Sequence, residues 1–327
     1  MLVLALLWWA WSAFVWAANA QDEHAVTLRV ALGLSMVTIF VCALAVPHAF
    51  GDEALLFACT YAGVRLVHLA LYTDASRRGN AKWSAIAGFA ATTVVGMALL
   101  VVGAAIGGHA QTVLWVIAAL IDYSGPAWLT RERLRGIQRV AVAHFAERYG
   151  LFVINCLGES IVSIGVGASS HGLDATRVIA VVLGAIVTTE LWFVYFDRAS
   201  EAMERELREH HDPVLAAADG YSYLHLPVIA GIIIFAVGGK ALVGDPGSAL
   251  DAAERLALCG GVALYLASHA AFLARLSRRV AAPHLVAAAA LIALFAVGSG
   301  LSAVVLTAVA ATILAALCVV ETVASQD

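Results

Sequence analysis

The chain has 327 residues, of which 62% are hydrophobic and 13% are charged, and its mean hydropathy is +0.89. Soluble domains carry roughly 25% charged residues, so this composition excludes a soluble protein and any separate soluble domain. The net charge of −4 carries little information because the charges lie in loops. We therefore expect an all-α, polytopic membrane protein in which residues 1–327 form a single integral membrane domain.

Hydropathy predicts eleven membrane-spanning helices, two of which lie within residues 284–320 and are separated at Gly298-Ser299-Gly300. The other nine cover residues 1–19, 27–46, 54–73, 83–106, 111–129, 148–168, 176–196, 218–240 and 254–274. Two charged amphipathic segments, 130–143 and 198–217, are expected on the cytoplasmic membrane surface.

The first span is rich in tryptophan and has no basic residue before it, so it is not a convincing signal peptide. Trp9 and Trp16 are seven residues apart and share one helical face. We interpret these two rings as packing residues rather than as members of an interfacial belt.

The third span carries a polar stripe, because Tyr61, Arg65, His68 and Tyr72 recur at i, i+4, i+7 and i+11. An arginine deep in a span needs a carboxylate or carbonyl partner, so Arg65 is either half of a structural ion pair or a functional residue. Asp122 stands near the end of the fifth span and is expected near a membrane surface.

The sixth span contains Glu159, a carboxylate inside an apolar run, at a cost of roughly 2.5–3.5 kcal/mol. Arg148 precedes Glu159 by 11 residues, which places the two about 20° apart around the helix and about 16 Å apart along it. Three interpretations stay open for Glu159: a structural acid bonded to a neighbouring helix, a proton or substrate site, and a lipid-facing residue.

The later spans carry Glu190, His225 and His269. Each histidine follows a tyrosine by four residues, Tyr221 in one span and Tyr265 in the other. A histidine in a span is either a hydrogen-bonded packing residue or part of a polar cavity, and the repeated Tyr-His spacing favours the cavity more than a lone histidine would.

The loops at 74–82, 130–148, 197–217 and 274–283 fall on one side and carry fourteen Lys and Arg residues, against three on the other side. The positive-inside rule places the first group in the cytoplasm, with the C-terminus inside and Met1 outside. A further span before Met1 would place both termini inside and bring the total to twelve.

A weak internal sequence repeat also supports a total of twelve spans. With a shift of 201 residues, His68 meets His269, and Ser76-Arg77-Arg78 meets Ser277-Arg278-Arg279. This predicts a parallel six-plus-six repeat, with an incomplete half at 1–129 and a second half at 144–327.

The segment from His144 to Val162, with Glu147-Arg148 and Leu157-Gly158-Glu159-Ser160, resembles the hallmark of the bacterial low temperature requirement A (LtrA) family. The segments Ile121–Pro126, Tyr195–Asp197 and Tyr221–Pro227 are also similar. The resemblance implies a multi-pass protein of the bacterial inner membrane. Members normally open with a helix of a type that is not seen at the start of this sequence, so the resemblance also leads us to expect a further helix before Met1. The family name refers to growth in the cold and implies no reaction.

The cysteines all fall in apolar segments and no pair has metal-ligand spacing, so neither disulfides, a metal site nor a cofactor is expected. The expected partners are the lipid bilayer, protons and a small solute, but not nucleic acid, and the oligomeric state stays open. Candidates for a proton or substrate path are Arg65, His68, Asp122, Glu159, Glu190, His225 and His269, and the motif residues are Glu147, Arg148, Gly158 and Ser160.

These buried ionisable residues favour a proton-coupled transporter or permeation protein. Here Glu159 binds the proton, Glu190 or His225 passes it on, and Arg65 pairs with an acid or binds an anionic substrate. The alternative is a non-transporting sensor, scaffold or lipid-interacting protein that supports growth at low temperature. An enzyme is not expected, because no HExxH, GxSxG or P-loop pattern occurs.

Overall fold

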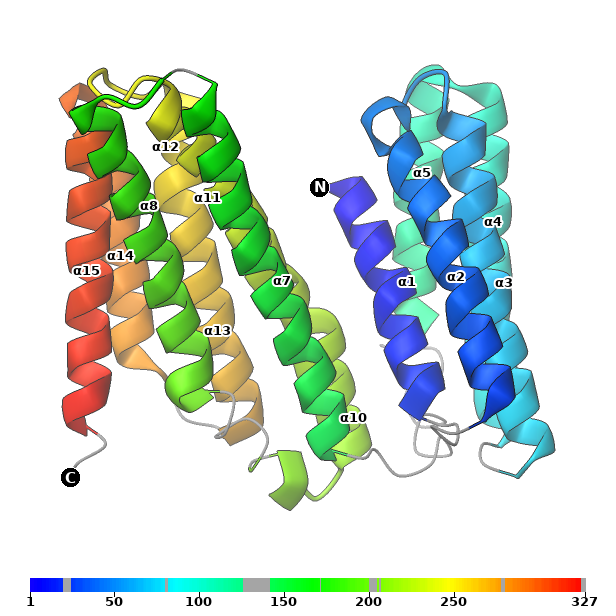
Figure 1. Cartoon of the computed structure of the whole chain (residues 1–327). Helices are drawn as coiled ribbons and strands as arrows, with labels where there is room; N and C mark the ends of the chain where they lie inside the picture. Colours follow the sequence, from blue (N-terminus) through cyan, green and yellow to red (C-terminus); the bar gives the residue numbers. More distant parts are fainter. Residues whose placement is uncertain are drawn as a thin grey trace. The chain divides into compact units, whose positions relative to one another are not determined.

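A computed structural model describes residues 1–19, 25–79, 82–125, 142–170, 172–199, 205, 207–277 and 280–324. These ranges are almost entirely helical and contain no strand beyond one isolated bridge between Ala249 and Ser302. The predicted all-α fold is therefore confirmed (Figure 1).

Ten helical stretches in the described ranges are long and apolar enough to cross a membrane. The fifth predicted span is not among these ten; it corresponds to α5 (Gly108–Ser124), which has 17 residues. The remaining principal helices are α1 (Leu2–Asn19), α2 (Val26–Ala45), α3 (Ala54–Arg77), α4 (Trp83–Ile106), α7 (Val142–Ser169), α8 (Ala175–Phe193), α11 (His225–Gly244), α13 (Gly261–Ser277), α14 (Ala282–Val297) and α15 (Ala303–Ala324). Short helices α10 (Pro213–Ala217) and α12 (Ala252–Arg255) precede α11 and α13.

The predicted spans agree with these helices to within a few residues at most ends, except that the fifth starts earlier, at Gly108, and the sixth starts earlier, at Val142. The predicted end of the fifth span, at residue 129, lies outside the described residues. The amphipathic segment predicted at 130–143 lies almost wholly outside the described residues. The segment predicted at 198–217 lies partly outside them and contains α10.

The chain divides into two compact units. Unit 1 comprises Met1–Ala141 and Asp212–Ser222, and unit 2 comprises Val142–His211 and Tyr223–Asp327. In unit 1, α3 packs against α1, α2 and α4, and α5 packs against α1 and α4.

Helices α4 and α5 pack closely against each other in unit 1. A Cβ atom at Gly103 would lie 2.9 Å from the indole of Trp115, whose Nε1 donates to Leu100 O at 2.9 Å. Because Gly103 has no side chain, the Trp115 ring fits against α4 at this position. Small residues are common where membrane helices approach closely.

Aromatic side chains hold α1 inside unit 1. Trp9 stacks on Tyr123 with ring centroids 4.1 Å apart, and Trp16 Nε1 donates to Ser222 Oγ at 2.8 Å. The predicted packing role of Trp9 and Trp16 is confirmed, and Trp8 adds a bond to Ser222 O at 2.8 Å.

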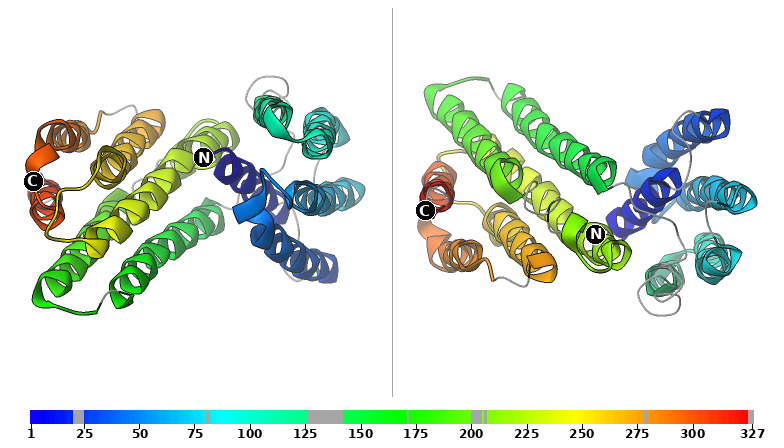
Figure 2. Two further views of the ribbon diagram at one scale, coloured as in Figure 1. Left: turned by 90° about the horizontal axis from the view of Figure 1, so that it is seen from above. Right: turned by 90° about the horizontal axis from the view of Figure 1, so that it is seen from below.

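In unit 2, α11 packs against α7 and α13, while α8 packs against α7 and α15 (Figure 2). α14 lies between α13 and α15 in the packing order. Glycines bring α11 and α13 together, because a Cβ atom at Gly231 would lie 2.7 Å from Gly261 O.

Three short segments, η3 (Val194–Ala199), η4 (Ala218–Leu224) and η5 (Leu256–Gly260), are π-helical. π-helical turns often occur at functional sites because they reset the direction of the side chains that follow. Here η3 contains Tyr195 and η4 leads directly into His225.

Candidate functional site

The polar core of unit 1 is an ion pair between α3 and α5. Arg65 Nη2 lies 2.9 Å from Asp122 Oδ1 and 2.8 Å from Oδ2, and the two side chains are 2% and 9% exposed. Arg65 also donates to Thr93 Oγ1 at 2.7 Å and to the Trp9 carbonyl at 3.4 Å. The prediction that Arg65 needs a carboxylate or carbonyl partner is confirmed.

Thr93 completes this network by donating to Asp122 Oδ1 at 2.8 Å. Asp122 lies in the last turn of α5, close to the end of the span as expected, but its carboxylate is buried against Arg65. This buried charge pair therefore links four helices, α1, α3, α4 and α5.

His68 follows Arg65 on the same face of α3 and is surrounded by aromatic rings. The centroids of Phe14, Tyr72 and Phe89 lie 6.1, 5.1 and 6.1 Å from its ring centroid. Its Nδ1 has no hydrogen-bond partner among the described residues. His68 is therefore packed next to the ion pair without being part of it.

The polar core of unit 2 begins at His225 in the first turn of α11. The Tyr195 hydroxyl and His225 Nε2 are 2.7 Å apart, and both residues are buried. Tyr149 and Phe272 place their rings against the same imidazole, with centroids 5.4 and 5.0 Å away.

His269 on α13 lies beside this pair and is fully buried. Its ring centroid is 5.7 Å from that of Tyr195, 5.7 Å from that of Tyr265 and 5.4 Å from that of His284. Tyr265 is itself engaged, since its hydroxyl donates to Leu191 O at 2.7 Å. Neither ring nitrogen of His269 has a hydrogen-bond partner in the described part of the chain.

His284 on α14 continues the contact toward α15. Its Nδ1 lies 3.3 Å from Glu321 Oε1, with side-chain exposures of 4% and 23%. We name the set Tyr195, His225, His269, His284 and Glu321 the histidine cluster. Its members come from η3, α11, α13, α14 and α15.

Sequence reasoning singled out His225 and His269 but missed the other three members of the histidine cluster. His284 follows Pro283 at the start of a helix and so resembles a loop residue. Glu321 is a carboxylate at the end of an apolar span, the same signal that drew attention to Glu159. That signal was available and would have found Glu321.

Glu190 is half-buried near the end of α8, and α8 packs against α15, which carries Glu321. Its Oε2 is buried and has no hydrogen-bond partner within the described ranges. Glu190 therefore lies on a helix next to the histidine cluster with an acceptor still available.

Glu159 lies on the exposed face of α7. The described structure gives it one long hydrogen bond, 3.5 Å from Ser163 Oγ on the same helix, and none to a neighbouring helix. Among the described residues, Glu159 is therefore not hydrogen-bonded to an adjacent helix, which was one of its three interpretations. Ser160, next in the chain, is buried, and its Oγ donates to Cys156 O at 3.0 Å.

The other motif residues also lie on α7. Glu147 is exposed, with an oxygen 3.6 Å from His144 Nδ1, while Arg148 is half-buried. Gly158 has open space beside its Cα, where an added Cβ would meet no heavy atom within 4 Å. The motif therefore has a buried side at Ser160 and an open side at Gly158 and Glu159.

Within the described ranges, no three His, Cys, Asp or Glu side chains are arranged to hold a metal ion. The five cysteines are free thiols, and Cys42 and Cys259 are buried.

Residues 1–319 match the family model described as Bacterial low temperature requirement A protein (LtrA). The protein RA0937 of Rhizobium meliloti (strain 1021), itself described as uncharacterized, is 30% identical over 287 residues. That alignment covers 86% of this chain and 70% of the relative. No solved structure matches the chain.

Proposed function

The chain belongs to the bacterial low temperature requirement A family of membrane proteins, and from that premise we propose that it is a proton-coupled permeation protein. In this proposal the histidine cluster of unit 2 carries the proton. We further propose that the protein lies in the inner membrane with its C-terminus in the cytoplasm and that it catalyses no covalent reaction.

The observation that carries the proposal is the environment of His269. It is fully buried, it touches three titratable rings, and neither of its nitrogens is hydrogen-bonded to a described residue. Leaving a buried polar atom unpaired costs about 1–3 kcal/mol. Two such atoms on one ring are therefore expected where they have a function, such as binding water or a proton. A water molecule or a transferred proton would satisfy them.

The cluster offers a sequence of sites for one proton. Glu321 contacts His284, His284 contacts His269, and Tyr195 lies between His269 and His225. A neutral imidazole has one donor and one acceptor nitrogen, so it accepts a proton on one side and releases another from the opposite side. Small ring rotations or bridging waters would complete the steps between rings that are in contact but not hydrogen-bonded.

The remaining candidates take different roles in this proposal. Glu190, with its available oxygen, is a second carboxylate for proton exchange, and Glu159 is an acid on the exposed face of α7. Arg65 is assigned a structural role, because the Trp9 carbonyl accepts from its Nη1 and because Thr93 and Asp122 accept from its Nη2.

The test is proton flux in liposomes that contain the purified protein and a pH-sensitive dye, under an imposed gradient and with a panel of small solutes. We expect flux in the parent and its loss in His269→Gln, which keeps a polar side chain but cannot be protonated. The matched control is His48→Gln, since His48 is an exposed histidine outside the cluster. Equal flux in His269→Gln and the parent would reject the role of the cluster.

A second function, a non-transporting sensor or scaffold, is favoured by a separate observation. The Arg65–Asp122–Thr93 network in unit 1 joins α3, α4 and α5, and both carboxylate oxygens of Asp122 are bonded within it. Absence of flux in a correctly folded parent, with every solute tested, would favour that function over permeation.

A further inference from the structure

We propose that unit 2 binds a phosphatidylethanolamine molecule, with one acyl chain in an apolar groove beside α13 and the headgroup at Arg255. This site is separate from the histidine cluster and does not depend on the proposed proton path.

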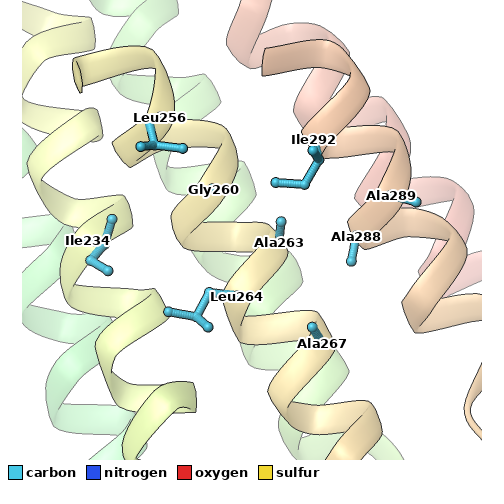
Figure 3. Close-up of a pocket in the computed structure, with 9 residues that line it drawn as sticks. All are labelled: Ile234, Leu256, Gly260, Ala263, Leu264, Ala267, Ala288, Ala289 and Ile292. Carbon is cyan, nitrogen blue, oxygen red and sulfur yellow. The ribbon is translucent and has the colours of Figure 1, made fainter. Parts of the chain in front are cut away.

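The groove lies between α11, α13 and α14, includes residues of η5, and has a volume of about 500 Å³ (Figure 3). Binding sites for small molecules typically measure about 300–1,000 Å³. The lining is wholly apolar and consists of Ile234, Leu256, Gly260, Ala263, Leu264, Ala267, Ala288, Ala289 and Ile292. Five of these nine residues are Gly or Ala, and their small side chains create the space.

The length of the groove matches one lipid leaflet. Leu256 lies at the start of the span and Ala267 is 11 residues further along, which corresponds to about 16 Å of helix. Half of a hydrocarbon core of about 30 Å is about 15 Å. A site of this length and polarity, set into membrane-spanning helices, fits an acyl chain that enters from one surface and ends near the bilayer centre.

A cation stands at the outer end of the groove. Arg255 directly precedes Leu256, its Nε donates to Phe295 O at 3.0 Å, and its Nη1 donates to Leu250 O at 3.0 Å. Its guanidinium also lies over the Phe295 ring, 5.3 Å from the centroid. A guanidinium has five N–H donors, so this fixed side chain retains donors for a phosphate oxygen.

Carboxylates beside this arginine select the headgroup. Asp251 and Glu254 form the capping box of α12. The Glu254 backbone N–H donates to Asp251 Oδ1 at 2.8 Å, and the Asp251 backbone N–H donates to Glu254 Oε2 at 3.2 Å. Their remaining lone pairs suit an ammonium group, and they repel a purely anionic headgroup. A phosphate at Arg255 next to an ammonium near Glu254 is the charge pattern of phosphoethanolamine.

The experiment measures lipid binding by native mass spectrometry of the detergent-purified full chain, with added phosphatidylethanolamine or phosphatidylglycerol of the same acyl chains. Ala288→Phe and Ala267→Phe fill the groove. We expect each to reduce the bound phosphatidylethanolamine by about tenfold or more, because a ring that displaces two or three methylene groups removes their burial.

The matched control is Val286→Phe, which adds a similar ring to α14 at a position that is 68% exposed and does not line the groove. Arg255→Gln should weaken the binding of both lipids, because both have the phosphate that Arg255 would bind. Glu254→Gln should reduce the preference for phosphatidylethanolamine over phosphatidylglycerol, because it removes a carboxylate assigned to the ammonium group. Equal retention in Val286→Phe and in whichever groove-filling variant folds as the parent does would overturn the groove. Equal binding of both lipids by the parent would overturn the headgroup assignment.

Discussion

At the scale of single residues, burial decides what each charged or polar side chain contributes. The Arg65–Asp122 pair and the Arg78–Asp74 pair have almost the same distance, 2.8 and 2.9 Å. The first is nearly inaccessible to solvent, while the side chains of the second are 51% and 30% exposed. A buried pair is strongly coupled because loss of one partner leaves an uncompensated charge, whereas an exposed pair contributes about 0–1 kcal/mol.

We therefore predict that Arg65→Met lowers the stability of the protein by about 3–5 kcal/mol, because Asp122 is left buried without its partner. Thermal unfolding of the detergent-solubilised protein measures the effect, with Arg78→Met as the exposed control. The double variant Arg65→Met, Asp122→Leu should recover much of the loss. A loss no larger than that of Arg78→Met would contradict the assignment of a structural ion pair.

Part of this could be anticipated from sequence. An arginine in an apolar span demands an acceptor, so a partner for Arg65 was predictable, but spacing along the chain does not identify a partner 57 residues away. His284 and Glu321 were missed because one borders a proline at a helix start and the other lies near a helix end. Their pairing depends on how α14 and α15 pack.

At the scale of helices, hydropathy located nearly every span, because the cost of exposing polar backbone to lipid makes long apolar helices unmistakable. The π-helical segments η3, η4 and η5 were not predicted. They depend on a local change of hydrogen-bond register that leaves no mark in composition. Because η3 contains Tyr195, this unpredicted segment positions part of the histidine cluster.

The contact of α11 with α13 depends on glycine. We predict that Gly231→Ala destabilises the protein by about 1–3 kcal/mol, because the new methyl group would lie 2.7 Å from two backbone atoms, Gly261 O and Tyr265 N. Gly165→Ala on α7, where no heavy atom lies within 4 Å of an added Cβ, should instead stabilise it by up to about 1 kcal/mol. Thermal unfolding distinguishes the two, and equal effects would contradict the close crossing.

At the scale of the whole molecule, four helix contacts of unit 1 have counterparts in unit 2, while the α1–α3 contact has no comparable counterpart between α8 and α13 in the described residues. The contacts α2–α3, α3–α4, α4–α5 and α1–α5 of unit 1 correspond to α11–α13, α13–α14, α14–α15 and α8–α15 of unit 2. A parallel repeat with His68 matched to His269 requires this correspondence. The half-repeat stays a prediction, and the segment Asp212–Ser222 packs in unit 1.

The orientation of the chain is a separate prediction at this scale. In a cysteine-free background, a membrane-impermeant maleimide should label Gly247→Cys in intact cells, because the loop at 245–251 is on the side with few basic residues. Arg78→Cys should be labelled only after permeabilisation. The reverse pattern would invert the predicted topology.

The most direct test of the central claim is proton flux through Tyr195→Phe in liposomes. This change removes one oxygen, and with it the 2.7 Å contact to His225 Nε2, while the aromatic ring stays in place. Tyr61→Phe is the matched control, because Tyr61 is an equally buried tyrosine of unit 1 whose hydroxyl has no hydrogen-bond partner among the described residues. We predict that flux is lost in Tyr195→Phe and retained in Tyr61→Phe. Flux retained at the parental rate in a folded Tyr195→Phe protein would contradict a proton path through the histidine cluster.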